Sequence, residues 1–180
     1  MSLSFWRKMA GLTQSPPGVS LREVLWSWLG AFLGIGAVAG LHNALFQGTD
    51  QVLLIGSFGA SAVLLYGMPK SPLAQPRNLL GGHVISAVIG VTAAKLLAFA
   101  PGWAAALAVS LSIVMMHLSR TLHPPGGATA LIAILGGPGI QRLGFFYVLV
   151  PVAAGALLLL VIALLVNNLA PQRRYPEYWW

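Results

Sequence analysis

The stretch HPPGG, residues 123–127, combines residue types that can begin a helix inside an apolar environment. Its two prolines lack the backbone N–H groups that would have no partner in a first helical turn, and their fixed φ suits that position. Gly126 and Gly127 let a ligand approach the backbone, and an apolar run follows at once. A helix that starts within the bilayer leaves its first N–H groups unpaired, at a cost of several kcal/mol each. These groups and the helix dipole are expected to bind an anion or a polar solute.

A second stretch, GSFGAS, places hydroxyl groups and an aromatic ring at the start of another short apolar segment. The runs GASAVLL (59–65) and GATALIA (127–133) align, which indicates an internal repeat. Two broken helices that converge near the membrane midplane would form one small polar site. The alternative is that the HPPGG stretch forms only a turn on the cytoplasmic side. The substrate-binding residues predicted from the two stretches are His123, Pro124, Pro125, Gly126, Gly127, Thr129, Gly56, Ser57, Phe58 and Ser61.

Histidines and cations beside the apolar segments are further candidates, because ionisable groups in a membrane are costly and often functional. His83 shares a predicted helix face with Ser86, and His117 shares one with Arg120. We therefore add His83, His117 and Arg120 to the predicted substrate-binding residues. Lys95 lies inside a predicted span. It either extends to the outer interface, as long charged side chains do, or draws anions inward.

Other classes of chemistry lack the residues they need. The chain has three acidic residues and no cysteine, so disulfides and thiolate chemistry are excluded. No arrangement of a nucleophile, a base and an acid is found, so we expect neither an enzyme nor a bound cofactor or metal. Carboxylate-based coupling to protons or cations is not expected either. Histidines titrate near neutral pH, which leaves both uniport and proton symport open.

The composition indicates an integral membrane protein. Of the 180 residues, 57% are hydrophobic and 7% are charged, whereas soluble domains carry about 25% charged residues. A span needs about 20 apolar residues, and three of the predicted segments reach that length. The predicted apolar segments are residues 21–46, 51–68, 79–100, 103–118, 128–135 and 143–169.

The distribution of the charged residues favours one of the possible membrane topologies. If all six segments cross, one side holds eight basic residues and the other holds Arg142 and Asp50, in agreement with the positive-inside rule. If only the HPPGG segment re-enters, five crossings place Arg173 and Arg174 outside. We predict an all-α membrane protein of six helical segments, arranged as two inverted three-helix repeats whose second segment is short. The eight basic residues are Arg7, Lys8, Arg22, Lys70, Arg77, Arg120, Arg173 and Arg174.

This topology gives the predicted organisation of the chain. Residues 1–20 are an interfacial segment, residues 21–170 a single membrane domain, and residues 171–180 an interfacial tail rich in aromatics. The two repeats cover about 21–100 and 102–169. Both termini are expected in the cytoplasm, with the domain in the plasma membrane.

Small residues four positions apart predict close helix packing. They occur in the first segment, where Gly30 precedes Gly34 and Gly36 precedes Gly40, and again in the third. A membrane domain this small, with glycine on its outer faces, is expected to form a homo-oligomer, with a dimer favoured. The net charge of +7 is a topology signal, so we expect a lipid bilayer and no nucleic acid as a partner.

The motifs GSFGASAVLLYGMPKSPLAQPRN (56–78), GGH (81–83) and LHPPGGATAL (122–131) resemble the HPP family of integral membrane proteins, over roughly residues 20–168. Plant members of that family are implicated in nitrite transport into chloroplasts, so the resemblance implies membrane transport of an anion. The family is commonly described as having four spans, and the six-segment prediction departs from that description.

The main hypothesis is therefore a small transporter or channel for nitrite or a similar small anion, bound at the broken helices. A channel for a small neutral polar solute is the alternative within transport. A membrane assembly subunit, in which the glycines serve packing alone, is the alternative outside it. An anion carrier should lose flux when the cations are replaced, a neutral channel should not, and an assembly subunit should lose a partner.

Overall fold

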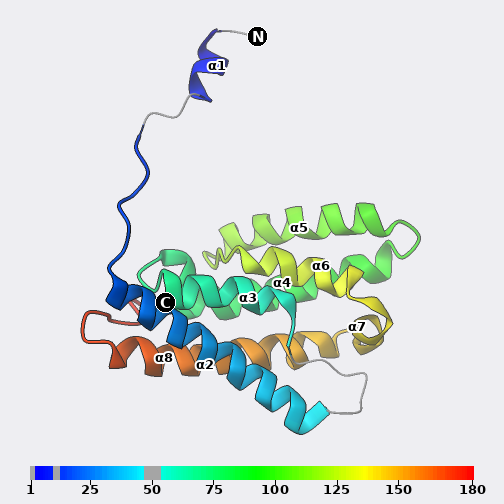
Figure 1. The fold of residues 1–180 in the computed structure, drawn as a ribbon. Coiled ribbons are helices and arrows are strands. Elements are labelled where there is room, and N and C mark those ends of the chain that lie inside the picture. Colours follow the sequence, from blue (N-terminus) through cyan, green and yellow to red (C-terminus); the bar gives the residue numbers. More distant parts are fainter. Residues whose placement is uncertain (1–2, 10–12, 47–53) are drawn as a thin grey trace.

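The computed structural model of the chain describes residues 3–9, 13–46 and 54–180, which contain helices and irregular segments but no strand. The predicted all-α class is confirmed for these residues. Asp50 and the first residues of the predicted segment 51–68 lie outside them. The elements in Figure 1 are α1 (Leu3–Lys8), α2 (Leu21–Phe46), α3 (Gly56–Ala62), the π-helix η1 (Val63–Gly67), the 3₁₀ turn η2 (Pro72–Ala74), α4 (Pro76–Leu96), α5 (Pro101–Leu118), α6 (Pro125–Leu135), α7 (Gly137–Leu143), the π-helix η3 (Val148–Ala153) and α8 (Ala154–Leu169).

Within the described residues, four segments are long and apolar enough to cross a membrane. They are Leu21–Ala44, Pro76–Leu96, Pro101–Leu118 and Val148–Leu169. The other two predicted segments form short helices, α3 with η1 and α6. At 1.5 Å per residue the 11 residues of α6 extend about 16 Å, about half of the 30 Å hydrocarbon core.

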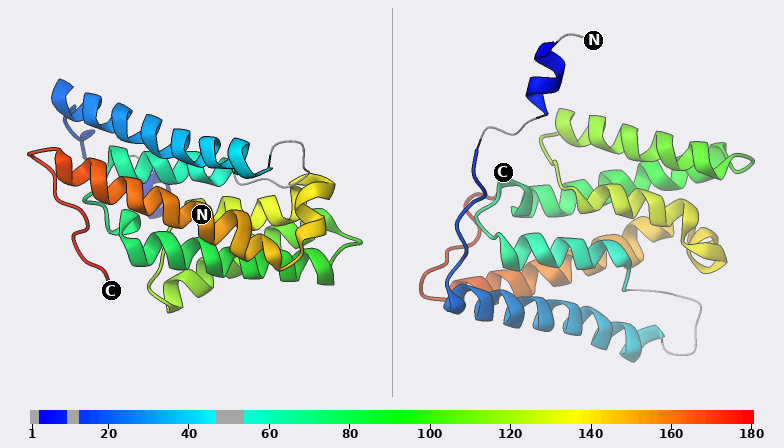
Figure 2. Two further views of the ribbon diagram at one scale, coloured as in Figure 1. Left: turned by 90° about the horizontal axis from the view of Figure 1, so that it is seen from below. Right: turned by 45° about the horizontal axis from the view of Figure 1, so that its top comes forward.

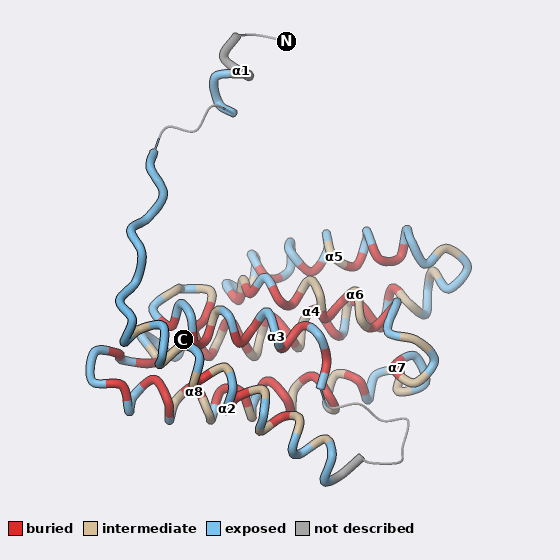
Figure 3. Tube along the Cα trace, in the orientation of Figure 1, coloured by how far each residue is buried: buried red, intermediate tan, exposed pale blue. Residues whose placement is uncertain are grey.

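The two short helices lie side by side in the middle of the bundle and run in opposite directions (Figures 1 and 2). On one side α6 packs against α4 and α5, and on the other α2 packs against α8. The inner faces are buried, whereas the outer faces of α2 and α5 expose large apolar side chains (Figure 3). This distribution suits a bundle surrounded by lipid, because lipid removes the need to bury apolar surface.

We name the two ends of the bundle after their residues. At the tail end, the start of α2, η2, the start of α4 and the C-terminal tail (170–178) come together, as the contacts of Arg173 with Glu23 and of Tyr175 with Ala74 show. At the Lys95 end, Lys95 of α4 lies beside Gly144, which follows α7. The short helices lie between these ends (Figure 2).

The predicted close packing at small residues is confirmed for some glycines and not for others. Gly30 and Gly34 of α2 lie against the ring of Tyr66, and a Cβ added at Gly34 would lie 2.2 Å from the Tyr66 hydroxyl. In contrast, a Cβ at Gly36 or Gly40 would meet nothing within 4 Å. The first pair therefore holds a neighbouring side chain, and the second pair faces outward.

The last predicted segment, residues 143–169, contains the candidate span Val148–Leu169, but it is kinked and begins after an interruption at Gly144. Gly144 has a positive φ of 52°, which ends α7, and Val150 has non-helical angles inside η3. Pro151 follows directly, and proline lacks the N–H group that a helix interior needs. The regular helix α8 begins only at Ala154.

Candidate functional site

Five polar side chains meet between α3, α4 and α6, and none of them is exposed to solvent. We call this group the polar cluster. Burying a polar group costs free energy unless it is hydrogen-bonded, and each member has at least one hydrogen-bond partner. The members are Ser57, Ser61, His83, His123 and Thr129.

His83 joins the two halves of the predicted repeat. Its Nε2 lies 2.7 Å from Oγ of Ser61 on α3, and its Nδ1 lies 2.7 Å from Oγ1 of Thr129 on α6. Ser61 and Thr129 occupy the same position when GASAVLL is aligned with GATALIA. One imidazole of α4 thus contacts equivalent hydroxyls from both short helices.

His123 extends the cluster toward the tail end. Its Nε2 lies 3.0 Å from the Ser61 hydroxyl, and its Nδ1 lies 2.8 Å from the Leu73 carbonyl oxygen in η2. A carbonyl only accepts, so Nδ1 of His123 carries the proton and donates to it. On the far side, Thr129 Oγ1 donates to Ser57 Oγ at 2.9 Å.

Aromatic and small residues fix the positions of the two imidazoles. The ring centroids of His83 and His123 are 4.9 Å apart, and Phe58 lies edge-on to His83 at 5.5 Å. A Cβ at Gly155 of α8 would lie 2.2 Å from the Phe58 ring, and one at Gly82 would lie 2.5 Å from Cβ of His123. Glycine at both positions lets the neighbouring rings approach the backbone.

The prediction of unpaired N–H groups at the start of α6 is wrong. The N–H of Gly126 donates to the His123 carbonyl at 2.8 Å, and that of Gly127 donates to the Pro124 carbonyl at 3.0 Å. The prolines supply no N–H, and the turn before the helix satisfies the groups that remain. Gly126 instead allows close packing, since a Cβ there would lie 2.7 Å from the carbonyl of Gly82. Gly126 and Gly127 therefore offer no free N–H donor to a ligand in the cluster.

Three successive carbonyl groups of η2 are hydrogen-bonded at the tail end. Pro72 accepts from the Tyr178 hydroxyl at 3.1 Å, Leu73 from His123, and Ala74 from the Tyr175 hydroxyl at 2.8 Å. Tyr175 and Tyr178 belong to the C-terminal tail, so the tail and the polar cluster hold the same turn. Sequence reasoning missed this role, because aromatics in a tail are also typical of membrane interfaces.

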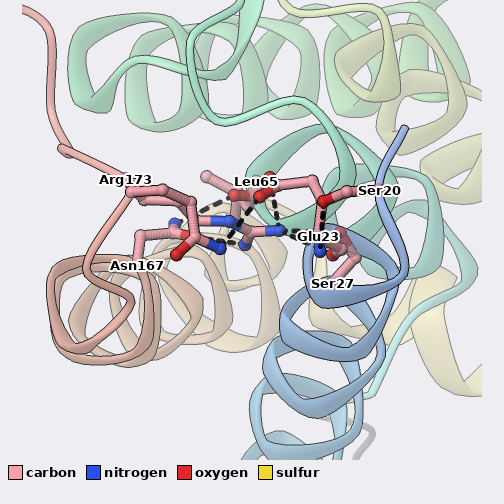
Figure 4. Close-up of polar contacts among 7 residues, drawn as sticks. Ser20, Glu23, Ser27, Leu65, Asn167 and Arg173 are labelled. Carbon is pink, nitrogen blue, oxygen red and sulfur yellow. Dashed lines mark hydrogen bonds and ion pairs between the residues drawn. The ribbon is translucent and has the colours of Figure 1, made fainter. Parts of the chain in front are cut away.

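A buried arginine fixes the tail to α2 (Figure 4). Nη2 of Arg173 lies 2.7 Å from Oε1 of Glu23, and the same nitrogen donates to Ser27 Oγ at 2.8 Å. Nη1 donates to Oδ1 of Asn167 at 2.9 Å, and Asn167 in turn donates to the Leu65 carbonyl at 3.0 Å. The sequence indicated Arg173 only as a topology charge, and no sequence signal identified its partner on α2.

At the Lys95 end a cavity of about 170 Å³ enters the bundle between α4, α5, α6 and α7. Its polar side chains are Lys95 and Gln141, and Val91 and Ala133 are among its lining residues. Ala133 is one helical turn beyond Thr129 along α6. Lys95 is exposed, with Nζ 6.0 Å from the Phe145 ring centroid, as expected of a cation that extends to the interface.

The remaining predicted site residues lie around the cluster or away from it. Pro125, Gly126 and Gly127 form the start of α6, with Pro125 and Gly126 buried, whereas Gly56 and Pro124 are exposed. His117 and Arg120 are exposed at the end of α5 and in the turn that follows. The structure therefore joins the serines, the threonine and two of the histidines, and leaves His117, Arg120 and Lys95 outside the polar cluster.

Comparison with known proteins places the chain in a family. The model of the HPP transmembrane region matches residues 16–176. Two transmembrane proteins of Dictyostelium discoideum are similar, one 48% identical over 99% of this chain and the other 49% identical over 94%. The chain spans 58% and 60% of the lengths of these relatives. No solved structure matches. The motifs and the family match agree, and the chain belongs to the HPP family of transmembrane proteins.

Proposed function

We propose that this protein transports nitrite or a similar small anion and that the polar cluster is the binding site. The observation that carries the proposal is the complete burial of two imidazoles and three hydroxyls at the junction of α3, α4 and α6. Apolar packing alone would not need these groups, and polar residues inside membrane domains are typical of substrate pathways. Hydroxyl and imidazole N–H groups are donors that an oxyanion can accept.

The cavity at the Lys95 end supports a route to the cluster. It holds a cation and an amide, which favour anions, and Ala133 in its lining is about 6 Å along α6 from Thr129. Along α4 and α6, the positions between the cluster residues and the cavity lining include Ala87, Gly90 and Ala130, and Gly90 lies against Ala130. At the tail end, the bonds of η2 to His123, Tyr175 and Tyr178 lie between the cluster and two surface cavities of about 480 Å³ and 410 Å³. We infer a site that opens to one end of the bundle at a time.

We further propose six crossings in two inverted repeats, with both termini in the cytoplasm and the domain in the plasma membrane. The antiparallel course of α3 and α6 supports this arrangement, as does the contact of His83 with Ser61 and Thr129. The positive-inside rule then puts the tail end in the cytoplasm. The tail end carries Arg22, Lys70, Arg77, Arg120, Arg173 and Arg174, and the Lys95 end carries Lys95 and Arg142.

A neutral polar solute is the second candidate. The observation that favours it is that none of the five cluster residues is a lysine or an arginine, so no permanent cation of the cluster faces a ligand.

We also propose that the protein works as a homodimer. Gly36 and Gly40 support a contact through α2, because added Cβ atoms there would meet nothing within 4 Å, and outward small residues favour helix association in lipid.

Uptake by liposomes tests the main proposal. We expect purified protein to take up nitrite faster than protein-free vesicles, and His123→Ala to abolish that difference while the variant still elutes as a folded protein. If wild type and variant both fail to transport nitrite but pass a neutral solute such as urea, the neutral-solute function replaces the anion function. If neither is transported, a role as an assembly subunit remains, and detection of a bound partner protein would test it.

A further inference from the structure

We propose that the polar cluster binds one proton together with the anion, so that transport is an electroneutral proton–anion symport. This inference rests on the proposed function and specifies how the same site is coupled. It is carried by the hydrogen-bond geometry of His123, Ser61, His83 and Thr129 and by the lack of charged partners around them.

With both imidazoles neutral, one direction of donation satisfies every contact between these side chains. His123 donates from Nδ1 to the Leu73 carbonyl, so its Nε2 accepts from the Ser61 hydroxyl. Ser61 has one proton, so its oxygen must accept from Nε2–H of His83. Nδ1 of His83 then accepts from the Thr129 hydroxyl. Because Thr129 has one proton, its bond with Ser57 is reversed in this state, and the Ser57 hydroxyl donates to Thr129. Each of the four side chains donates once and accepts once.

The same heavy-atom positions accommodate one additional proton. If Nε2 of His123 also carries a proton, it donates to Ser61, and Ser61 turns its own proton toward Nε2 of His83. The His83 proton then moves to Nδ1 and donates to Thr129, whose hydroxyl donates to Ser57 at 2.9 Å. The two arrangements differ by one proton on His123 and by the direction of the remaining bonds. Loading the proton thus requires turning hydroxyl groups and changing a tautomer, with no movement of a helix.

No fixed charge in the described residues balances either a proton or an anion at this position. The ionisable groups on the surrounding elements are directed elsewhere. On α4, Arg77 donates to the Ser119 carbonyl and Lys95 is exposed. His117 of α5 and Arg120 in the turn that follows are also exposed. The neutral hydroxyl of Tyr147, which precedes η3, donates to the Thr129 carbonyl, and Tyr175 of the tail donates to Ala74. The two described carboxylates also lie outside the cluster: Glu23 pairs with Arg173, and Glu177 is exposed in the tail.

Because no fixed charge among the described residues near the cluster compensates either a proton or an anion, we expect the two to bind together. An anion alone would be an unpaired charge in a buried environment, and so would a protonated imidazole, and both are strongly disfavoured. Each therefore increases the affinity for the other, and such coupling is reciprocal. The pair carries no net charge across the membrane, so its movement should not respond to the membrane potential.

The test uses liposomes that contain the full chain and a pH-sensitive dye, with the membrane potential clamped by potassium and valinomycin. We expect the interior to acidify faster during nitrite entry than it does in protein-free vesicles. The protein-free vesicles correct for passive entry of nitrous acid. A change of 60 mV in the clamped potential should alter the initial rate by less than twofold. A proton gradient of one pH unit, with the more acidic solution outside the liposomes, should raise the initial rate of nitrite entry several-fold.

Two variants connect the coupling to the cluster. His123→Asn keeps an N–H that can reach the Leu73 carbonyl but cannot hold an extra proton, and we expect uptake to fall at least tenfold, with any residual uptake driven by the potential. His83→Gln, which breaks the relay at its centre, should behave in the same way. His42→Asn is the matched control, because α2 supplies no residue of the polar cluster, and it should retain wild-type uptake and acidification. Elution from a sizing column verifies that each variant is folded.

The possible outcomes distinguish failure of the proposed symport from failure of the proposed anion transport. Nitrite uptake that follows the potential without acidification would overturn the symport and leave the anion-transport function in place. Voltage-independent uptake that persists at the wild-type rate in folded His123→Asn would also overturn it, because the proton would not be held by the cluster. Absence of nitrite uptake in the wild type would overturn the proposed function, and the symport with it.

Discussion

The two ends of the bundle differ in what separates the polar cluster from the surroundings. At the tail end, three carbonyls of η2 are bonded to His123 and to two tail tyrosines, and the Arg173–Glu23 pair fixes the tail to α2. At the Lys95 end, a cavity reaches Ala133, and small residues separate it from the cluster. Directional polar bonds thus lie between the cluster and the tail end, whereas helix packing that includes the close approach of Gly90 to Ala130 lies between the cluster and the cavity.

The difference indicates how the two ends could open. Polar bonds can be exchanged for other bonds, so the tail end can open when water bonds to the η2 carbonyls or when an anion competes for the hydroxyl and N–H donors that these carbonyls accept from. Contacts between small side chains open by a slight separation of α4 and α6. The following changes test this comparison.

The largest expected difference is in the reactivity of cysteines placed at the two ends. The natural chain has no cysteine, so a single introduced thiol reports its own position. In nanodiscs, where both ends face water, Ala94→Cys in the cavity lining should react with a charged methanethiosulfonate at least 100-fold faster than Ala74→Cys, which is fully buried in η2. Equal rates measured by mass spectrometry would show that the tail end is not closed.

Removing the arginine of the tail should open the closed end. Arg173→Met removes an ion pair and bonds to Ser27 and Asn167, and hydrogen bonds to charged groups are worth roughly 1.5–3 kcal/mol. We expect the free energy of unfolding to fall by about 2 kcal/mol and the reactivity of Ala74→Cys to rise about tenfold. The matched change Arg174→Met, at an exposed neighbour, should alter neither. Unchanged reactivity in the Arg173 variant would show that the tail does not control this end.

The smallest effect is expected at the mouth of the cavity. Lys95 is exposed, and exposed charges contribute about 0.2–1 kcal/mol and are screened by salt. Lys95→Gln should raise the half-saturating nitrite concentration two- to threefold at low ionic strength and should have no effect at high salt. Arg120→Gln at the tail end serves as the control for net charge. An equal effect of both variants would show that overall charge, rather than the cavity, attracts the anion.

Local sequence signals predicted the parts of the molecule that depend on local residue types. The apolar run 21–46 predicted the bounds of α2, and the aligned GAS and GAT runs predicted that Ser61 and Thr129 lie in two short segments, which are α3 and α6. The cost of burying histidine in a membrane pointed to His83 and His123. Together with Ser57, these four residues make up the polar cluster, and all five were among the predicted ones.

The remaining features depend on contacts between distant segments. The Leu73 carbonyl has no sequence signature as a partner of His123, and the tail tyrosines resemble ordinary interfacial aromatics. The first N–H groups of α6 were expected to be free because the turn that satisfies them could not be anticipated. The interruption before α8 arises from Gly144 and Pro151, which interrupt a run whose hydropathy alone predicts one helix.

The most direct test of the central claim removes one hydroxyl from the cluster and leaves the shape of the side chain. Nitrite uptake by liposomes with Thr129→Val should be at least tenfold lower than with wild type, because His83 loses its partner on α6. Thr92→Val is the matched control, since Thr92 is exposed on α4 and donates only to its own helix at Val88. Loss of uptake in Thr129→Val with wild-type uptake in Thr92→Val is the predicted result. Wild-type uptake in both folded variants would contradict the assignment of the polar cluster as the anion site.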